Sequence, residues 1–356
     1  MLPQVLPKEK FEALVSLLIR GGGGLDPSRV VAPVARGPQF AFAPIAADEI
    51  GTIRMDYDIT ILPPKKLLHP QHQELLKFSG HGPKGVTADV TAETTVLLGA
   101  HPYDLHGIAT LDAAFSQAPN DPYYLAKRQA TKLIGLNIAG GYINEYQFMA
   151  DMGTLEAPAG GFDLFLTDLG SRYLVEVGSP WGEKAVKAFT GFKPASADDL
   201  KAKQGFDAAK TGAYAKKLPY DTRYLPELLA ESYDSLLWDA ISRRCFSCGT
   251  CTNVCPTCYC FDVMDKLNLD VTTGTRERVW DSCQLKSFAE VAGGENFREH
   301  KANRLRHRMF RKGKYILERT GRLGCVGCGR CVKHCVAKIS ILEAFQQIAS
   351  TPAAEM

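Results

Sequence analysis

The chain has 356 residues, a formal net charge of +3 and eleven cysteines, all of them between positions 245 and 335. This length predicts two domains, and the clustered cysteines exclude a secreted scaffold held together by disulfides spread along the chain. Residues 1–20 lack the apolar core of a signal peptide, and no apolar run is long enough to span a bilayer. We therefore expect a cytoplasmic protein without a membrane span.

The first 222 residues alternate between apolar, β-branched stretches and stretches with helical spacing, which predicts an N-terminal domain of the α/β type. An amphipathic helix is expected before Arg20. Strands are expected at residues 30–34, 40–45, 94–98, 132–137, 162–167 and 173–177. Helices are expected at residues 103–115, 122–131 and 181–189, and residues 201–220 are expected to form a helix that leads into a linker.

Residues 223–356 are predicted to form a C-terminal, α-helical ferredoxin-like domain, so the fold class of the whole chain is α+β. One helix is expected at residues 225–244, immediately before the first cysteines, and another at residues 339–348, immediately after the last ones. Between the two groups of cysteines lies a long insertion, residues 256–324, which compact ferredoxins lack.

Eight cysteines form two runs with the same spacing, C-x2-C-x2-C-x3-C. The first run is Cys245, Cys248, Cys251 and Cys255, and the second is Cys325, Cys328, Cys331 and Cys335. This spacing is typical of 4Fe–4S clusters, and in two-cluster ferredoxins the fourth cysteine of each run binds the other cluster. We therefore predict one cluster on Cys245, Cys248, Cys251 and Cys335, and a second on Cys325, Cys328, Cys331 and Cys255. A zinc site would leave the middle cysteine of each run without a role.

Three cysteines remain, Cys258, Cys260 and Cys283. One hypothesis is a third metal site, with Asp281 or another residue as a further ligand. The alternative is that they pack as small apolar side chains beside the clusters, where their S–H groups could contact cluster sulfur. The aromatic residues around them favour the alternative.

Residues 298–322 carry ten Lys and Arg against two Glu. Such a segment could bind nucleic acid, but it contains few aromatic residues and no recognition motif. We therefore expect a solvated face or a docking site for an acidic partner, and no nucleic-acid partner.

No other motif indicates catalysis. His69, His72, His101 and His106 lack the spacing of a metal site, so they are expected to be core or solvated residues. No dinucleotide fingerprint or activated nucleophile is present either. No catalytic residue is therefore predicted.

The segments CPTCYCFD at 255–262, WDSC at 280–283 and VAGG at 291–294 resemble the iron–sulfur beta subunits of cytosolic sulfhydrogenases, which are NAD(P)-linked nickel–iron hydrogenases, and the corresponding iron–sulfur chain of anaerobic sulfite reductase. The resemblance extends upstream through residues 63–71, 104–108, 121–124 and 163–168. It implies a non-catalytic chain with two 4Fe–4S clusters. Such a chain relays electrons between a catalytic subunit, such as a nickel–iron hydrogenase, and a flavin- and NAD(P)H-binding subunit.

The resemblance leaves alternatives open. Related subunits serve sulfite reductase and heterodisulfide reductase systems, so the terminal substrate is not fixed. Many members also carry extra cysteines in the first domain, where this chain has Tyr103 and Ile138, which implies that any additional cluster bound there is lost. Two other hypotheses are reduction of a sulfur substrate at Cys258, Cys260 and Cys283 and, ranked last, a nucleic-acid binder.

Overall fold

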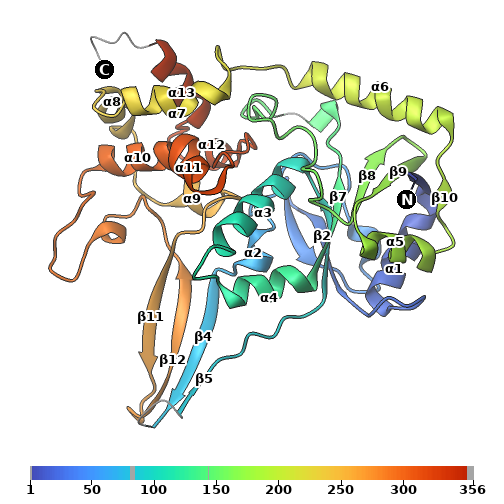
Figure 1. Cartoon of the computed structure of the whole chain (residues 1–356), viewed down its shortest axis with the longest axis horizontal. Helices are drawn as coiled ribbons and strands as arrows, with labels where there is room; N and C mark the ends of the chain where they lie inside the picture. The colour runs from blue at the N-terminus through green and yellow to red at the C-terminus, as the bar shows by residue number, and fades with distance from the viewer. Residues whose placement is uncertain (1, 81–84, 143, 351–356) are drawn as a thin grey trace.

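The computed structural model of the chain describes residues 2–80, 85–142 and 144–350. Three parts can be followed in Figure 1: an eight-stranded sheet with its helices, a group of helices that contains the cysteines, and a narrow four-stranded sheet that projects from the molecule. The mixed content of helix and sheet confirms the α+β class.

The large sheet has the strand order β10-β1-β9-β8-β7-β6-β2-β3. Its strands are β1 (Gln4–Pro7), β2 (Arg29–Arg36), β3 (Gln39–Pro44), β6 (Thr95–Ala100), β7 (Thr131–Leu136), β8 (Leu164–Asp168), β9 (Arg172–Val177) and β10 (Lys193–Pro194). Strands β2, β6, β7 and β8 are parallel, and the outer pairs are antiparallel. The central strands β6 and β7 are buried along almost their whole length, as expected for a parallel sheet covered on both faces. All six predicted strands are confirmed.

The helices of this part are α1 (Phe11–Arg20), α2 (Lys65–Leu68), α3 (Pro102–Phe115), α4 (Pro122–Ala130), α5 (Pro180–Ala188) and α6 (Ala197–Ala213). Three of these six helices, α4, α5 and α6, begin at a residue whose side chain caps the first turn. Proline occupies the first turn of α3, α4 and α5, where its missing N–H costs nothing. Helix α6 starts earlier than predicted because Ser196 and Asp199 form a capping box, in which each side chain accepts the backbone N–H of the other residue.

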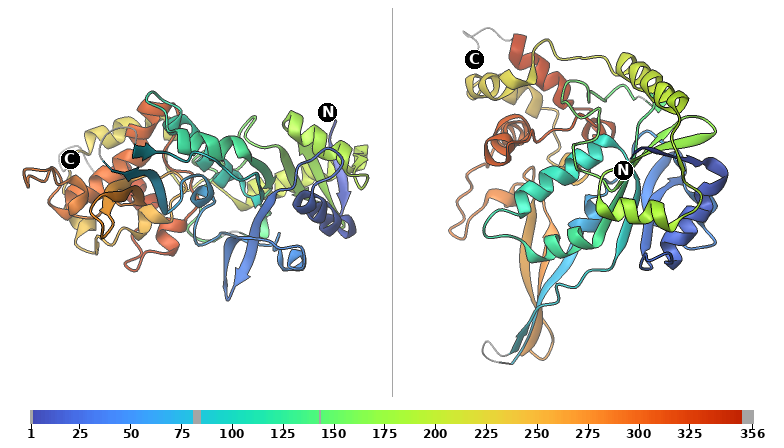
Figure 2. Two further views of the ribbon diagram at one scale, coloured as in Figure 1. Left: turned by 90° about the horizontal axis from the view of Figure 1, so that it is seen from below. Right: turned by 45° about the vertical axis from the view of Figure 1, so that its right-hand side comes forward.

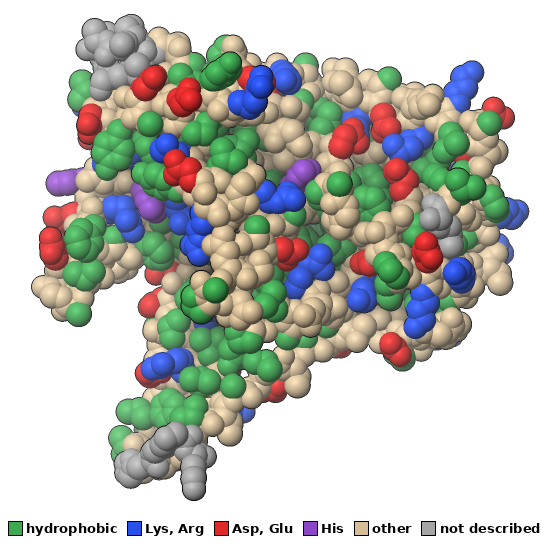
Figure 3. Space-filling view, viewed as in Figure 1, with side chains coloured by type: hydrophobic (Ala, Val, Ile, Leu, Met, Phe, Trp, Pro, Cys, Tyr) green, Lys and Arg blue, Asp and Glu red, His purple; other side chains and the backbone are tan. Residues whose placement is uncertain are grey.

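The projecting sheet combines strands from both predicted domains. Its order is β11-β12-β4-β5, with β4 (His72–Ser79), β5 (Val86–Thr87), β11 (Phe261–Leu267) and β12 (Thr273–Trp280). Strand β12, from the insertion, pairs antiparallel with β4, so the insertion is tied to the N-terminal part of the chain. Every residue of the edge strand β11 is exposed, and apolar side chains lie on the surface of this arm (Figure 3), which protrudes in Figure 1 and in the right-hand panel of Figure 2.

The cysteine-rich part is helical. Its helices are α7 (Leu225–Glu231), α8 (Leu237–Ser242), α9 (Thr250–Asn253), α10 (Lys301–Phe310), a π-helical segment (Arg311–Tyr315), α11 (Ile316–Thr320), α12 (Arg330–Lys333) and α13 (Ile341–Ser350). The predicted helix at 339–348 is confirmed by α13. The prediction of one helix at 225–244 was wrong, because the chain turns at residues 232–236. There the buried indole of Trp238 donates to the carbonyl of Ser232 at 2.6 Å, and the Ser235 hydroxyl accepts the N–H of Leu237.

A buried ion pair joins the second cysteine run to the N-terminal part. The guanidinium of Arg330 binds both carboxylate oxygens of Asp104 at 2.6 and 2.8 Å, and its Nε donates to the carbonyl of Thr60 at 2.9 Å. Both charged side chains are fully buried.

Among the described residues, no helix combines the length and apolar character needed to cross a membrane.

Candidate metal centre

The two cysteine runs have the same local fold. Each short helix, α9 or α12, follows a left-handed glycine, Gly249 (φ 78°) or Gly329 (φ 75°). The residue before the second cysteine of each run, Ser247 or Gly327, is also left-handed. Its N–H donates to the sulfur of the first cysteine of the same run, at 3.3 Å for Ser247 and 3.5 Å for Gly327. Such N–H groups stabilise negative charge on sulfur, as a metal-bound thiolate requires.

The second run needs its glycines because it lies against the N-terminal part. A Cβ atom on Gly327 would lie 2.7 Å from the backbone of Phe148, and one on Gly329 would lie 3.0 Å from the backbone of Tyr146. The backbone of Phe148 also donates to the carbonyl of Gly327 at 2.9 Å. The first run carries Ser247 at the position equivalent to Gly327.

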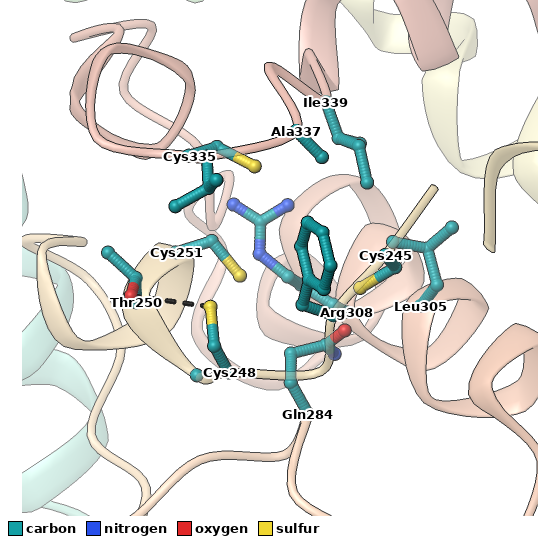
Figure 4. Close-up of a pocket in the computed structure, with 13 residues that line it drawn as sticks. Cys245, Cys248, Thr250, Cys251, Gln284, Leu305, Arg308, Cys335, Ala337 and Ile339 are labelled. Atoms are coloured by element: carbon teal, nitrogen blue, oxygen red, sulfur yellow. Dashed lines mark hydrogen bonds between the residues drawn. The ribbon is translucent and has the colours of Figure 1, made fainter. Parts of the chain in front are cut away.

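One cysteine of the second run lies with three of the first. Cys245, Cys248, Cys251 and Cys335, here called the first cysteine set, line one pocket, and Figure 4 shows their sulfur atoms around it. Helices α9 and α12 are in contact, which brings Cys335 to the first run. The pocket therefore contains the four residues predicted for one cluster.

The second cysteine set consists of Cys325, Cys328, Cys331 and Cys255. Cys325 and Cys328 are buried, and burial raises the pKa of the Cys328 thiol to about 12. The sulfur of Cys255 lies 3.3 Å from the Thr257 hydroxyl, which donates to the carbonyl of Gly324, the residue before Cys325. The chain thus also brings Cys255 across the insertion to the second run.

The remaining cysteines form contacts between thiols. Cys258 hydrogen-bonds to Cys255, and Cys260 hydrogen-bonds to Cys283, which lowers the pKa of Cys260. The amide of Gln284 lies 3.6 Å from the sulfur of Cys283. In the described part of the chain, no three His, Cys, Asp or Glu side chains are grouped to hold a single metal ion. These contacts support packed thiols beside the two sets.

Three buried cations lie against the cysteine sets: Lys65, Arg308 and Lys312, which are 3%, 3% and 1% exposed. The Lys65 ammonium donates to the carbonyl of Cys258 at 2.8 Å, the Lys312 ammonium donates to the Thr257 hydroxyl at 2.6 Å, and Arg308 lines the pocket of the first set. Within residues 2–80, 85–142 and 144–350, none of the three forms an ion pair with a carboxylate. An uncompensated buried charge costs several kcal/mol. The site is therefore suited to a negatively charged group, and thiolate-bound iron–sulfur clusters fit it.

The charge of Arg308 interacts with thiols of both cysteine sets. Burial opposes its protonated form, but nearby thiols together outweigh burial and raise the pKa of Arg308, led by Cys251 and Cys331, one from each set. Conversely, burial raises the pKa of the Cys251 thiol to about 11, and Arg308 opposes that rise. The guanidinium is thus placed to stabilise negative charge on the sulfur atoms.

The prediction of a solvated basic face was wrong for three of its residues. Arg304, Arg308 and Lys312 are buried, and they follow one another at intervals of four along the continuous helix from α10 to α11. This spacing places them on one face of a helix, and it is the signal that sequence reasoning missed. Lys65 carries no comparable signal in the sequence.

The four histidines make the contacts expected of core or solvated residues, although His106 lines a pocket that also contains Cys325 of the second set. His101 is buried and hydrogen-bonds to two backbone carbonyls, whereas His72 is exposed and lies 2.7 Å from Glu277. His106 contacts a backbone carbonyl. His69 is buried against Trp280, and neither of its ring nitrogens has a hydrogen-bond partner.

His69 should make the stability of the chain depend on pH. Burial lowers its pKa from 6.5 to about 3, so the folded state resists protonation that the unfolded state accepts. Stability should therefore fall as the pH drops below 6.5, by up to about 1.4 kcal/mol per pH unit. His69→Phe should remove this part of the pH dependence, as measured by anaerobic urea unfolding between about pH 7.5 and about pH 5.5. Equal pH dependence in both proteins would contradict the assignment.

Tyr103 and Ile138 are buried in a small apolar cluster with Val326 and Cys328 of the second run. The Tyr103 hydroxyl donates to the carbonyl of Asp58 at 2.7 Å. These two side chains therefore pack the junction between the two parts of the chain.

Comparison with known proteins agrees with this site. Residues 244–339, which include both cysteine runs, match the 4Fe-4S dicluster domain family. Sulfhydrogenase 2 subunit beta of Pyrococcus furiosus is 33% identical over 321 residues, which cover 90% of this chain and 92% of that protein. No solved structure matches. The chain thus belongs to the family of sulfhydrogenase beta subunits.

Proposed function

We propose that this chain is an electron-transfer subunit with two 4Fe–4S clusters, one on the first cysteine set and one on the second. The observation that carries this proposal is the pocket in which three cysteines of the first run lie with Cys335 of the second. Clusters bound in this way supply one-electron transfer. Residues 1–222 would form a scaffold domain, to which the cluster domain, residues 223–356, is fixed by Arg330 and Asp104.

Within a complex in the cytoplasm, the chain would relay electrons between a catalytic subunit of the nickel–iron hydrogenase type and a flavin- and NAD(P)H-binding subunit. The similarity to one chain of a sulfhydrogenase supports this role. The pocket of the first set is lined by four thiols, Arg308 and several apolar side chains, a lining suited to holding a cluster. We therefore assign to this chain binding, orientation and electrostatic tuning of its clusters.

The first cysteine set lies nearer the surface than the second. Cys248 is exposed, whereas Cys325 and Cys328 are buried. At the rim of the first pocket, Phe246 and Val336 are 72% and 79% exposed. Large exposed apolar side chains beside a redox site are suited to contact with a partner protein. We propose that a partner subunit docks here and exchanges electrons with the cluster of the first set.

Phe246→Glu should slow reduction of the clusters by the flavin-containing partner, because a charge at the rim opposes docking. The measurement is the rate of cluster bleaching after NAD(P)H is added to the anaerobic complex. Leu200→Glu, at an exposed apolar position on α6, is the matched control and should keep the rate. An unchanged rate in the Phe246 variant, with full iron, would contradict docking at this rim.

A second assay separates the relay from a chain that reduces a sulfur substrate at Cys258, Cys260 and Cys283. The isolated, iron-replete chain should be reduced by an artificial electron donor and reoxidised by an artificial electron acceptor, without converting polysulfide to sulfide. Sulfide production that Cys283→Ala abolishes would contradict the relay as its sole function.

A further inference from the structure

We propose that two buried cations raise the two reduction potentials unequally: Arg308 acts mainly on the cluster of the first cysteine set, and Lys312 mainly on that of the second. This inference rests on the proposed function. It concerns two residues of the basic segment, which were expected to lie on a solvated face. Both instead lie in the interior, between α10 and the cysteine runs.

Arg308 faces the first set. Its guanidinium lies in the pocket among the four sulfur atoms in Figure 4. Its Nε has no hydrogen-bond partner, and its Nη1 contacts the sulfur of Met309 at 3.8 Å. Since no carboxylate of the described residues pairs with it, the groups left to compensate its charge are the thiolates and the cluster that they bind.

Lys312 is linked to the second set through one hydroxyl. Its ammonium donates to the Thr257 hydroxyl at 2.6 Å, and this hydroxyl lies 3.3 Å from the sulfur of Cys255. Lys312 belongs to the π-helical segment, and Gly313 beside it packs closely on Leu229 and Leu225. The local widening of the helix and this packing hold the ammonium in place.

Reduction adds one negative charge to a cluster, so a nearby cation stabilises the reduced form and raises the potential. The effect is large where water is excluded and small at the surface, where solvent and salt screen the charge. Arg308 and Lys312 are both buried, so their effect on the potential should be large. Lys314 is partly exposed and already paired with Glu318 at 2.8 Å, so its effect should be small.

The test is an anaerobic redox titration of the full chain, followed by electron paramagnetic resonance, with iron content measured on the same samples. Arg308→Met should lower the ratio of reduced to oxidised first-set cluster at least tenfold at a fixed potential, a shift of about 59 mV for a one-electron couple. Lys312→Met should do the same for the other cluster. The two variants should therefore change the gap between the potentials in opposite directions.

Three further variants make the result specific. Arg308→Lys keeps the charge and should restore most of the potential, whereas Lys314→Met, the matched control, should leave both potentials unchanged. Cys335→Ala, which should lose the first-set cluster, identifies which signal belongs to which set.

Iron-replete Arg308→Met and Lys312→Met proteins with unchanged potentials would overturn this inference and leave the relay intact. Loss of iron in Arg308→Met together with a normal potential in Arg308→Gln would assign Arg308 a structural role and also overturn it. Absence of iron–sulfur signals from the unmodified chain would contradict the proposed function itself.

Discussion

Cys335→Ala should remove the cluster of the first cysteine run and leave the cluster of its own run in place. The reason is the crossed arrangement, in which Cys335 shares a pocket with Cys245, Cys248 and Cys251. A cubane held by only three thiolates is expected to be lost, so the content should fall from about eight irons per chain to about four. The measurement is iron and acid-labile sulfide in anaerobically purified protein.

Comparison among variants distinguishes crossed from uncrossed ligation. Cys335→Ala should give the same residual spectrum as Cys251→Ala, and Cys255→Ala the same as Cys331→Ala. Cys283→Ala removes a buried thiol outside both sets and should keep about eight irons, two cubanes of four. If Cys335→Ala instead matched Cys331→Ala, each run would bind its own cluster and the crossed assignment would be wrong.

Arg330→Met should cause the largest loss of stability among the substitutions considered, because it leaves the carboxylate of Asp104 buried without a partner. Both side chains are fully buried, and Arg330 makes two bonds to Asp104 and two to Thr60. Removing one partner of such a pair costs about 3–5 kcal/mol. The expected result is a large fall in the thermal midpoint, followed by circular dichroism under anaerobic conditions.

Lys333→Gln provides the control for Arg330→Met. Lys333 pairs with Asp58 in the same region, but both side chains are partly exposed, at 31% and 22%. Exposed pairs contribute about 0–1 kcal/mol, so this variant should unfold close to the unmodified chain. Equal midpoints for the two variants would show that the Arg330–Asp104 pair does not hold the two parts of the chain together.

Local sequence patterns predicted the elements whose form depends on neighbouring residues. The apolar runs of β6 and β7 and the proline starts of α3 and α5 each depend on a few adjacent residues. Cysteine spacing predicted the turn of each run because that turn is local, whereas the crossed assignment of Cys335 and Cys255 followed from the general rule for two-cluster ferredoxins. The resemblance to a known family led to the prediction of an electron-transfer subunit, which the cysteine spacing alone could not provide.

The features that sequence reasoning missed depend on contacts between distant segments. Pairing of β12 with β4 joins the insertion to residues about two hundred positions earlier in the chain, for example Val279 with His72, and no periodicity indicates it. The break before α8 depends on the hydrogen bond that the indole of Trp238 donates to the carbonyl of Ser232. The basic face was predicted to lie in solvent because charged side chains usually do. Arg308 and Lys312 instead face thiols contributed by other elements.

The most direct test of the account is the metal content of the chain prepared without oxygen. We expect about eight irons and about eight acid-labile sulfides per chain, in two cubanes that each accept one electron. Zinc bound in place of iron, without labile sulfide, would contradict it.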